Sequence, residues 1–180
     1  DFKSVYSLDL DEIRFCISSI TKNGVYDMPI FDFVSRSRKK EKAHIDIRGG
    51  GIVIIEGLHA LNPIMLEGIN PNTVFKIYIS VNTPVLNDDG SVLLTSRQIR
   101  LIRRSLRDNL YRGSDIYHTL KLWTSVVEGE AKYLYAHKDS ADIKITTLHP
   151  YELAVFRDAF LKMTENLDAS IENYDYVMRT

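Results

Sequence analysis

The stretch from Arg97 to Arg112 contains six arginines and no lysine, in the run RQIRLIRRSLRDNLYR. At about 3.6 residues per turn, Ile99, Ile102 and Leu106 fall on one apolar stripe of a helix. A separate stripe carries most of the arginines, namely Arg97, Arg100, Arg103 or Arg104, and Arg107. The spacing therefore predicts a helix over about 95–113 that packs one side against a core and presents guanidinium groups on the other.

The arginine stripe indicates recognition of a polyanion. A guanidinium offers a planar fork of donors that matches two phosphate oxygens at once, which a lysine ammonium cannot do. The alternative interpretation is an ordinary solvated helix face. Because only Asp108 offsets the charge within the run, the phosphate interpretation is favoured.

Composition places this helix in an ordinary globular chain of 180 residues, which we expect to form one domain over 1–180. The formal net charge of −1 makes the basic helix a local feature, so general nucleic-acid binding is not expected. With Cys16 as its single cysteine, the chain has no intrachain disulfide. No apolar stretch approaches the ~20 residues of a membrane span, and no signal peptide is recognisable, so we expect a cytosolic protein.

The first part of the chain predicts one helix and one irregular segment. Asp9 and Glu12 have the spacing of a capping box before a helix over 9–22, and Gly24 provides its stop. Residues 25–38 are interrupted by Pro29 and predict an irregular strand or loop. A half-buried strand is expected over 43–47.

The apolar run Ile52–Ile55 is typical of a strand that is buried on both faces in a parallel sheet. Glu56 follows this strand, and ligands of open α/β sheets bind beyond such strand ends, so Glu56 is a candidate contact for magnesium. A helix-capping role or a simple strand-end charge is the alternative. Further strands are expected over 74–81 and 141–146, a loop over 82–91, and helices over 116–137 and 151–166, which together indicate a layered α/β fold.

Three strings resemble motifs of the uridine kinase and phosphoribulokinase family of P-loop kinases: IVIIEGLHALNP at 52–63, PIFDF at 29–33 and RLIRRSLRDNLYRG at 100–113. The strings WTSVVEGEAKYLY at 123–135, ADIKI at 141–145 and YELAV at 151–155 are similar to its bacterial and protist uridine-kinase-like branch. The likeness runs from residue 1 to about 166. It implies a three-layer α/β/α kinase fold built on a parallel sheet.

The resemblance also implies an activity, namely the ATP-dependent phosphorylation of a pyrimidine nucleoside at its 5′-hydroxyl, with magnesium. Glu56 would help to organise the metal, and Phe31 and Phe33 would line the nucleoside pocket, with Phe31 stacking on the base. The alternative is that both phenylalanines fill the core. The arginine helix resembles the family's lid, in which arginines neutralise charge on the transferred group. These residues are Arg100, Arg103, Arg104 and Arg107, and Arg112 ends the lid helix.

The sequence departs from the family at three places. No GxxxxGK[ST] phosphate loop occurs in it, so this loop and the first strand are expected upstream of Asp1 in a longer parent chain. Arg36 stands where the family places a base-contacting histidine, which leaves the pyrimidine specificity open. Asp1 is the nearest candidate for the aspartate that activates the acceptor hydroxyl, whereas Asp9 fits better as a helix cap.

Two other function classes stay open at this stage. One is a non-catalytic relative that binds nucleotide or phosphate through the arginines, and the other is an RNA-binding module with steep salt dependence. Because a lid acts only where something else holds the triphosphate, we expect the 180 residues alone to be nearly inactive. Self-association is expected from the family, and Trp123 and Tyr133 belong either to a core or to a subunit contact.

Overall fold

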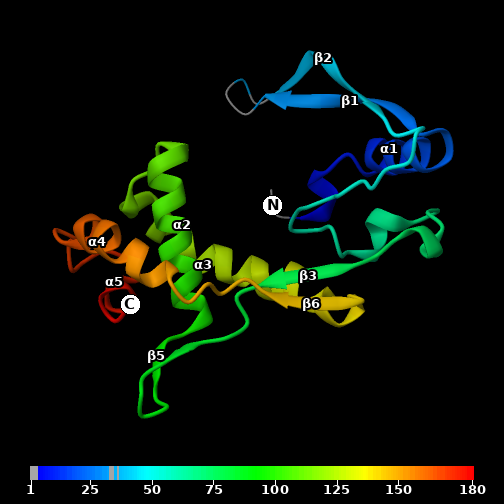
Figure 1. Cartoon of the computed structure of the whole chain (residues 1–180). Coiled ribbons are helices and arrows are strands. Elements are labelled where there is room, and N and C mark those ends of the chain that lie inside the picture. The colour runs from blue at the N-terminus through cyan, green and yellow to red at the C-terminus, as the bar shows by residue number, and fades with distance from the viewer. Residues whose placement is uncertain (1–3, 33–34, 36) are drawn as a thin grey trace. The chain divides into compact units, whose positions relative to one another are not determined.

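Figure 1 shows the computed structural model of the chain, which describes residues 4–32, 35 and 37–180. Its contacts divide the chain into two compact units. The first comprises Asp1–Lys76 and Tyr133–Ala141, and the second comprises Ile77–Lys132 and Asp142–Thr180. Three residues that the sequence singles out lie outside the described residues, namely Asp1, Phe33 and Arg36.

The first unit begins with the short 3₁₀ turn η1 (Val5–Ser7) and the helix α1 (Leu10–Asn23). Asp9 caps α1 by accepting a hydrogen bond from the Glu12 backbone N–H at 3.1 Å. Gly24 ends it in the left-handed conformation, with φ of 73°. The expected helix is confirmed, with Asp9 as its N-terminal cap and Gly24 as its stop.

A hairpin follows α1, in which β1 (Val25–Asp32) pairs antiparallel with β2 (Ser37–Asp46). Of the two alternatives for 25–38, an irregular strand or a loop, the structure has an irregular strand over Val25–Asp32, and the strand expected over 43–47 begins earlier, at Ser37. The register shifts between Pro29 and Phe31, so the proline lies at an irregularity of the ladder. A proline cannot donate to the ladder, and such a shift accommodates it without ending the strand.

The apolar run Ile52–Ile55 is not a strand, which corrects the prediction of a doubly buried one. Ile52 is 90% exposed and Ile54 is 85% exposed. A strand needs a neighbour for its backbone hydrogen bonds, and no strand of the described residues pairs with this segment. Beyond it, the first unit continues through the 3₁₀ turns η2 (Pro63–Leu66) and η3 (Pro71–Thr73).

The second unit contains a parallel pair of strands, β3 (Ile77–Ser80) and β6 (Ile143–Thr146), which lie side by side in Figure 1. In register, Ile77 faces Ile143 and Ile79 faces Ile145. Parallel pairing of strands separated by helices is the arrangement expected of an α/β fold. The predicted α/β class is confirmed, although both strands are shorter than expected.

The segment expected as a loop over 82–91 contains one strand of a small hairpin. In it β4 (Val85–Leu86) pairs with β5 (Val92–Leu94) around a turn at residues 87–90. Leu94 is buried and leads into helix α2, so the hairpin is anchored at its base.

The helices of the second unit are α2 (Ser96–Arg112), α3 (Ile116–Gly129), α4 (Glu152–Thr164) and α5 (Tyr174–Met178). Thr95 and Gln98 form a capping box at the start of α2, and Gly113 ends it with φ of 61°. After α3 come a π-helical turn, η4 (Glu130–Leu134), and a 3₁₀ segment, η5 (Tyr135–Ser140). No helix of the described residues is long and apolar enough to cross a membrane.

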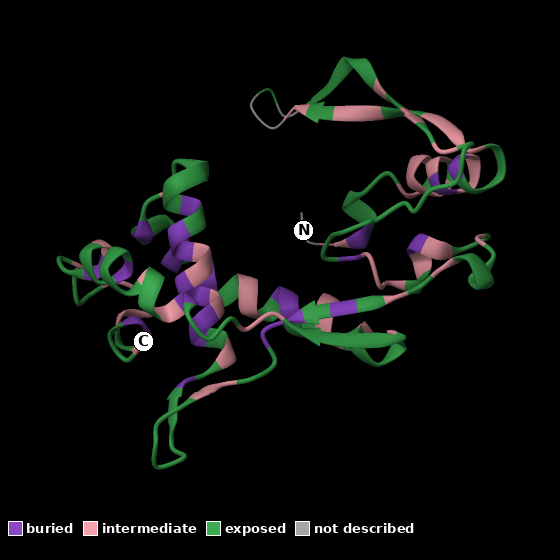
Figure 2. Cartoon of the chain, viewed as in Figure 1, coloured by how far each residue is buried: buried purple, intermediate pink, exposed green. Residues whose placement is uncertain are grey.

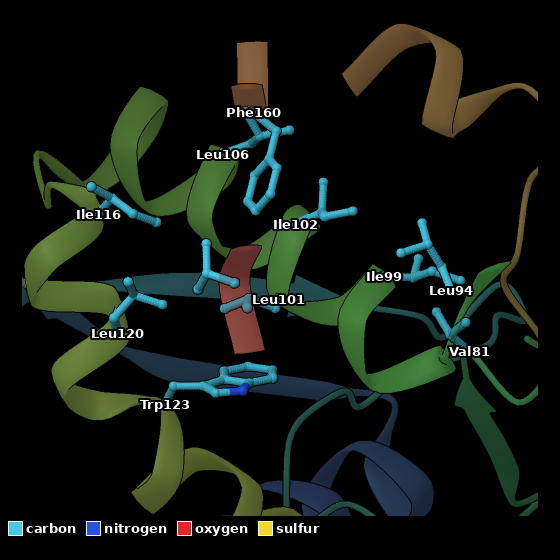
Figure 3. Close-up of a cluster of buried hydrophobic side chains, with 11 residues drawn as sticks. Val81, Leu94, Ile99, Leu101, Ile102, Leu106, Ile116, Leu120, Trp123 and Phe160 are labelled. Atoms are coloured by element: carbon cyan, nitrogen blue, oxygen red, sulfur yellow. The ribbon is translucent and has the colours of Figure 1, made fainter. Parts of the chain in front are cut away.

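The core of the second unit is built around α2. Figure 2 shows buried residues along this helix, and the predicted apolar stripe of Ile99, Ile102 and Leu106 is confirmed as part of the core. Figure 3 shows Leu101 of the same helix near Trp123 of α3, which places Trp123 in this core. The fold thus fixes which side of α2 is buried and, with it, where the arginines emerge.

Candidate functional site

Arg103 of α2 is held by groups from two other segments of the second unit. Its Nε and Nη2 atoms donate to the Glu152 carboxylate at 2.7 and 2.8 Å, as a bidentate fork. Its Nη1 donates to the Thr147 hydroxyl at 3.1 Å, and its Nη2 also donates to the Thr147 carbonyl. Glu152 begins α4 and its side chain is only 4% exposed. The guanidinium of Arg103 therefore docks α2 against the start of α4.

Arg100, one turn earlier, is paired in a similar way. Its Nη2 donates to the Glu130 carboxylate at the start of the π-helical turn η4. Glu130 is buried, and buried carboxylates of this kind are stable only when they are paired. Arg100 and Arg103 thus hold α2 to carboxylates that lie far away in the sequence.

The other arginines of the C-terminal half of α2 surround one buried carboxylate, that of Asp108. The Arg104 Nε lies 3.2 Å from Oδ2, while the Arg107 Nε and Arg112 Nη1 donate to Oδ1 at 3.4 and 3.1 Å. Three positive charges face one negative charge, so two remain in excess. Burial lowers the pKa of Arg104 from its ordinary value, although arginine stays charged at neutral pH. We name Arg104, Arg107, Arg112 and Asp108 the arginine cluster.

The arginine cluster is accessible from solvent at its outer members. The side chains of Arg107 and Arg112 are 48% and 55% exposed. In the described part of the chain, each makes one hydrogen bond, to Asp108. A guanidinium has five N–H donors, so each of the two arginines has further donors for a ligand. The cluster can therefore bind an anion with several oxygens, such as a polyphosphate.

In the first unit, Phe31 lies on β1 opposite Arg38 of β2 and is 49% exposed. Arg38 donates to the Asp9 carboxylate at 2.7 Å, which ties β2 to the start of α1. This bond and the one from the Glu12 backbone both lower the pKa of Asp9, the backbone bond more strongly. Asp9 is thus fully engaged as a cap and an ion-pair partner in this structure.

A second bond ties the hairpin to α1 through Tyr26 of β1. Its hydroxyl donates to the Glu12 carboxylate, and this bond, more than burial, raises the pKa of Tyr26 to about 12. The Glu12 side chain does not complete the expected capping box, because it serves Tyr26 instead. The hairpin that carries Phe31 is therefore held by one bond from each strand, to Glu12 of α1 and to its cap residue Asp9.

Glu56 is exposed and follows an unpaired segment rather than the end of a strand. No three histidine, cysteine, aspartate or glutamate side chains gather into a metal site within residues 4–32, 35 and 37–180. A lone carboxylate still fits magnesium, which proteins often bind through one or two carboxylates together with the phosphates of a substrate. Close to Glu56 in the sequence, His59 is buried and packs edge to face on Tyr133, with ring centroids 5.1 Å apart.

Comparison with known protein families gives one match that covers most of the chain. The model of the phosphoribulokinase and uridine kinase family matches residues 1–154. The chain belongs to this family. The membership accounts for the helices and the parallel strand pair of the second unit, and it confirms the resemblance that the sequence motifs indicate.

Several relatives within the phosphoribulokinase and uridine kinase family share 27–28% of their residues with this chain over the matched regions. A uridine kinase from Saccharomyces cerevisiae is 27% identical over 156 residues, which cover 86% of this chain and 28% of the relative. A uridine kinase from Clostridium novyi is 28% identical over 130 residues, covering 72% and 53% of the two chains. A mouse uridine-cytidine kinase-like protein is 28% identical over 123 residues, or 68% and 19%. The chain therefore spans about half or less of the length of these relatives.

The structure brings together part of the site that the sequence predicts for a member of this family. Arg100, Arg103, Arg104, Arg107 and Arg112 all lie on α2 in the second unit, whereas Phe31 and Glu56 lie in the first. Sequence reasoning missed Glu130 and Glu152, because a carboxylate 30 or 49 residues from its arginine leaves no local signal. Asp108 did leave a local signal, because it is the single acidic residue within the arginine run.

Proposed function

We propose that the protein containing this chain transfers the γ-phosphoryl group of ATP to the 5′-hydroxyl of a nucleoside such as uridine or cytidine. Membership of the phosphoribulokinase and uridine kinase family supports a kinase of this class. The observation that carries the proposal is the arginine cluster, with its two excess positive charges and its exposed donors on Arg107 and Arg112. Phosphoryl transfer depends on such positioning and charge stabilisation more than on covalent chemistry.

Each predicted site residue has a part in this proposal. The phosphates of ATP are contacted by Arg107 and Arg112, and also by Arg104, whose side chain is more buried than those of the other two. Arg100 and Arg103 orient the helix, because each is bonded to a buried carboxylate, Arg100 through Nη2 and Arg103 as a bidentate fork. Since lid contacts tighten in the transition state, Arg103 can affect the rate through the position of α2.

The nucleoside and the metal involve the first unit. Phe31 stacks on the base from the exposed face of the hairpin, and Phe33 and Arg36, which lie outside the described residues, line the same pocket. Asp1, also outside them, is the candidate for accepting the proton of the 5′-hydroxyl. Glu56 would contact magnesium, which neutralises phosphate charge when bound.

The test is a coupled assay of ADP formation with the full-length protein, ATP, magnesium and a panel of nucleosides. We expect ADP formation that depends on uridine or cytidine. ATP binding without any nucleoside-dependent ADP formation would instead support a non-catalytic phosphate-binding relative. In the same assay, the 180 residues alone should be nearly inactive, because they contain no GxxxxGK[ST] loop to position the triphosphate.

A further inference from the structure

Asp108 occupies an unusual position for an acidic residue on a helix that is proposed to bind phosphate. A carboxylate repels a polyphosphate, and simple electrostatics would place none here. Asp108 is nevertheless buried, and it contacts all three arginines of the cluster at 3.1–3.4 Å. Its backbone carbonyl also accepts the Gly113 and Ser114 N–H groups that end α2.

The three arginines need a partner of this kind to stay together. Arg104, Arg107 and Arg112 lie within nine residues of one helix, so their guanidinium groups repel one another when no anion is bound. Asp108 lies between them and uses both carboxylate oxygens, Oδ2 for Arg104 and Oδ1 for the other two. Arg107 bonds to Asp108 through Nε and Arg112 through Nη1, so the other N–H groups of both guanidiniums can donate to an anion.

We propose that Asp108 is a positioning residue, which holds Arg104, Arg107 and Arg112 as a preformed anion-binding cluster. This inference rests on the proposed function, because the anion in question is the polyphosphate of the nucleotide. Asp108 does not touch the ligand. It sets the directions of the donors, so that binding does not have to order three long side chains.

The inference predicts a result opposite in sign to that of charge counting alone. Asp108→Asn removes one negative charge with little change in size, which by Coulomb's law alone would strengthen anion binding. We expect it to weaken the binding of inorganic tripolyphosphate to the full-length protein about tenfold, the scale on which a charged hydrogen bond contributes. Isothermal titration calorimetry at two salt concentrations would measure this change.

A matched control is Asp88→Asn, which removes the same charge from an exposed turn of the second unit. Its tripolyphosphate affinity should equal that of the wild type. Equal or tighter binding by Asp108→Asn, with an unchanged thermal unfolding midpoint, would overturn the inference. If Arg107→Ala and Arg112→Ala also leave tripolyphosphate binding unchanged, the proposed phosphate site itself fails; if they weaken it and Asp108→Asn does not, only the role of Asp108 fails.

A second measurement on the wild-type protein keeps the inference testable if the Asp108 variant does not fold. Arginine Nε–H groups that are held in hydrogen bonds exchange slowly with water and give observable NMR signals. The Nε–H signal of Arg107, which donates to Asp108, should be present before any anion is added. A signal that appears only after tripolyphosphate is added would show that the cluster is not preformed.

Discussion

Arg103 and Glu152 form a bidentate ion pair between α2 and the first residue of α4, with N–O distances of 2.7 and 2.8 Å. The Glu152 side chain is almost fully buried, while about a quarter of the Arg103 side chain is exposed. The two residues are separated by 49 positions in the sequence, so their bond fixes the arginine helix relative to the rest of the second unit. The position of α2, and with it the position of its arginines, therefore depends on the carboxylate of Glu152.

The Arg103–Glu152 pair predicts a loss of stability when its acid is neutralised. Glu152→Gln keeps the shape of the side chain but directs an amide N–H toward guanidinium donors, which leaves polar groups unsatisfied. We expect the free energy of unfolding to fall by about 1–3 kcal/mol, measured by urea denaturation. Glu165→Gln, an exposed glutamate just after the same helix, should change it by less than about 0.5 kcal/mol. Equal effects of the two substitutions would argue against the pair.

Tyr26 predicts a stability change at alkaline pH. Its hydroxyl donates to Glu12, and its pKa in the folded state is about 12 against an ordinary value of 10.0. The folded state thus retains this proton longer than the unfolded state, and the contribution of Tyr26 is fully present below pH 10.0 and is lost as the pH rises toward about 12. The stability difference between the wild type and Tyr26→Phe should therefore shrink over this range, as followed by urea unfolding.

Tyr6→Phe is the control for the alkaline experiment, because Tyr6 is largely exposed and lies in the same unit. Its stability difference from the wild type should stay constant with pH. A wild-type advantage over Tyr26→Phe that does not change between neutral and alkaline pH would contradict the role of the Glu12 bond.

Local signals in the sequence were enough to predict α1 and α2. Asp9 and Gly24 bound α1 through contacts with their own neighbours, and the apolar stripe of α2 follows from its spacing alone. The pairing of strands is a different matter. The run Ile52–Ile55 has the composition of a buried strand, but a strand exists only where another strand accepts its hydrogen bonds, and no local pattern supplies that.

The same distinction applies to the candidate site. The run of arginines is evident in the sequence, and the helical spacing of the apolar residues between them predicts that they lie on one helix. Their partners were not, because Glu130 and Glu152 reach α2 only through the tertiary fold. Pro29 did leave a local signal: its break in the alternating pattern predicts an irregular strand or loop, and the structure has a strand whose register shifts between Pro29 and Phe31.

Phe31 predicts a selective effect on the nucleoside. If its ring stacks on the base, Phe31→Ala should raise KM for uridine about tenfold, since stacking on an aromatic side chain contributes ~1–3 kcal/mol. KM for ATP should stay close to its wild-type value. Initial rates of ADP formation at varied uridine and at varied ATP separate the two constants. Phe75→Ala, which alters another exposed phenylalanine of the first unit, should change neither.

Arg107 predicts an effect on the chemical step itself. Its exposed guanidinium is available to charge that develops on the transferred phosphoryl group, so Arg107→Ala should lower kcat about 10²-fold with little change in KM for the nucleoside. Steady-state assays of the full-length protein with ATP, magnesium and uridine would measure both. Arg157→Ala removes an equally charged and more exposed residue from α4, and it should leave kcat unchanged. A rise in nucleoside KM alone for Arg107→Ala would show that this arginine binds the substrate without stabilising the transition state.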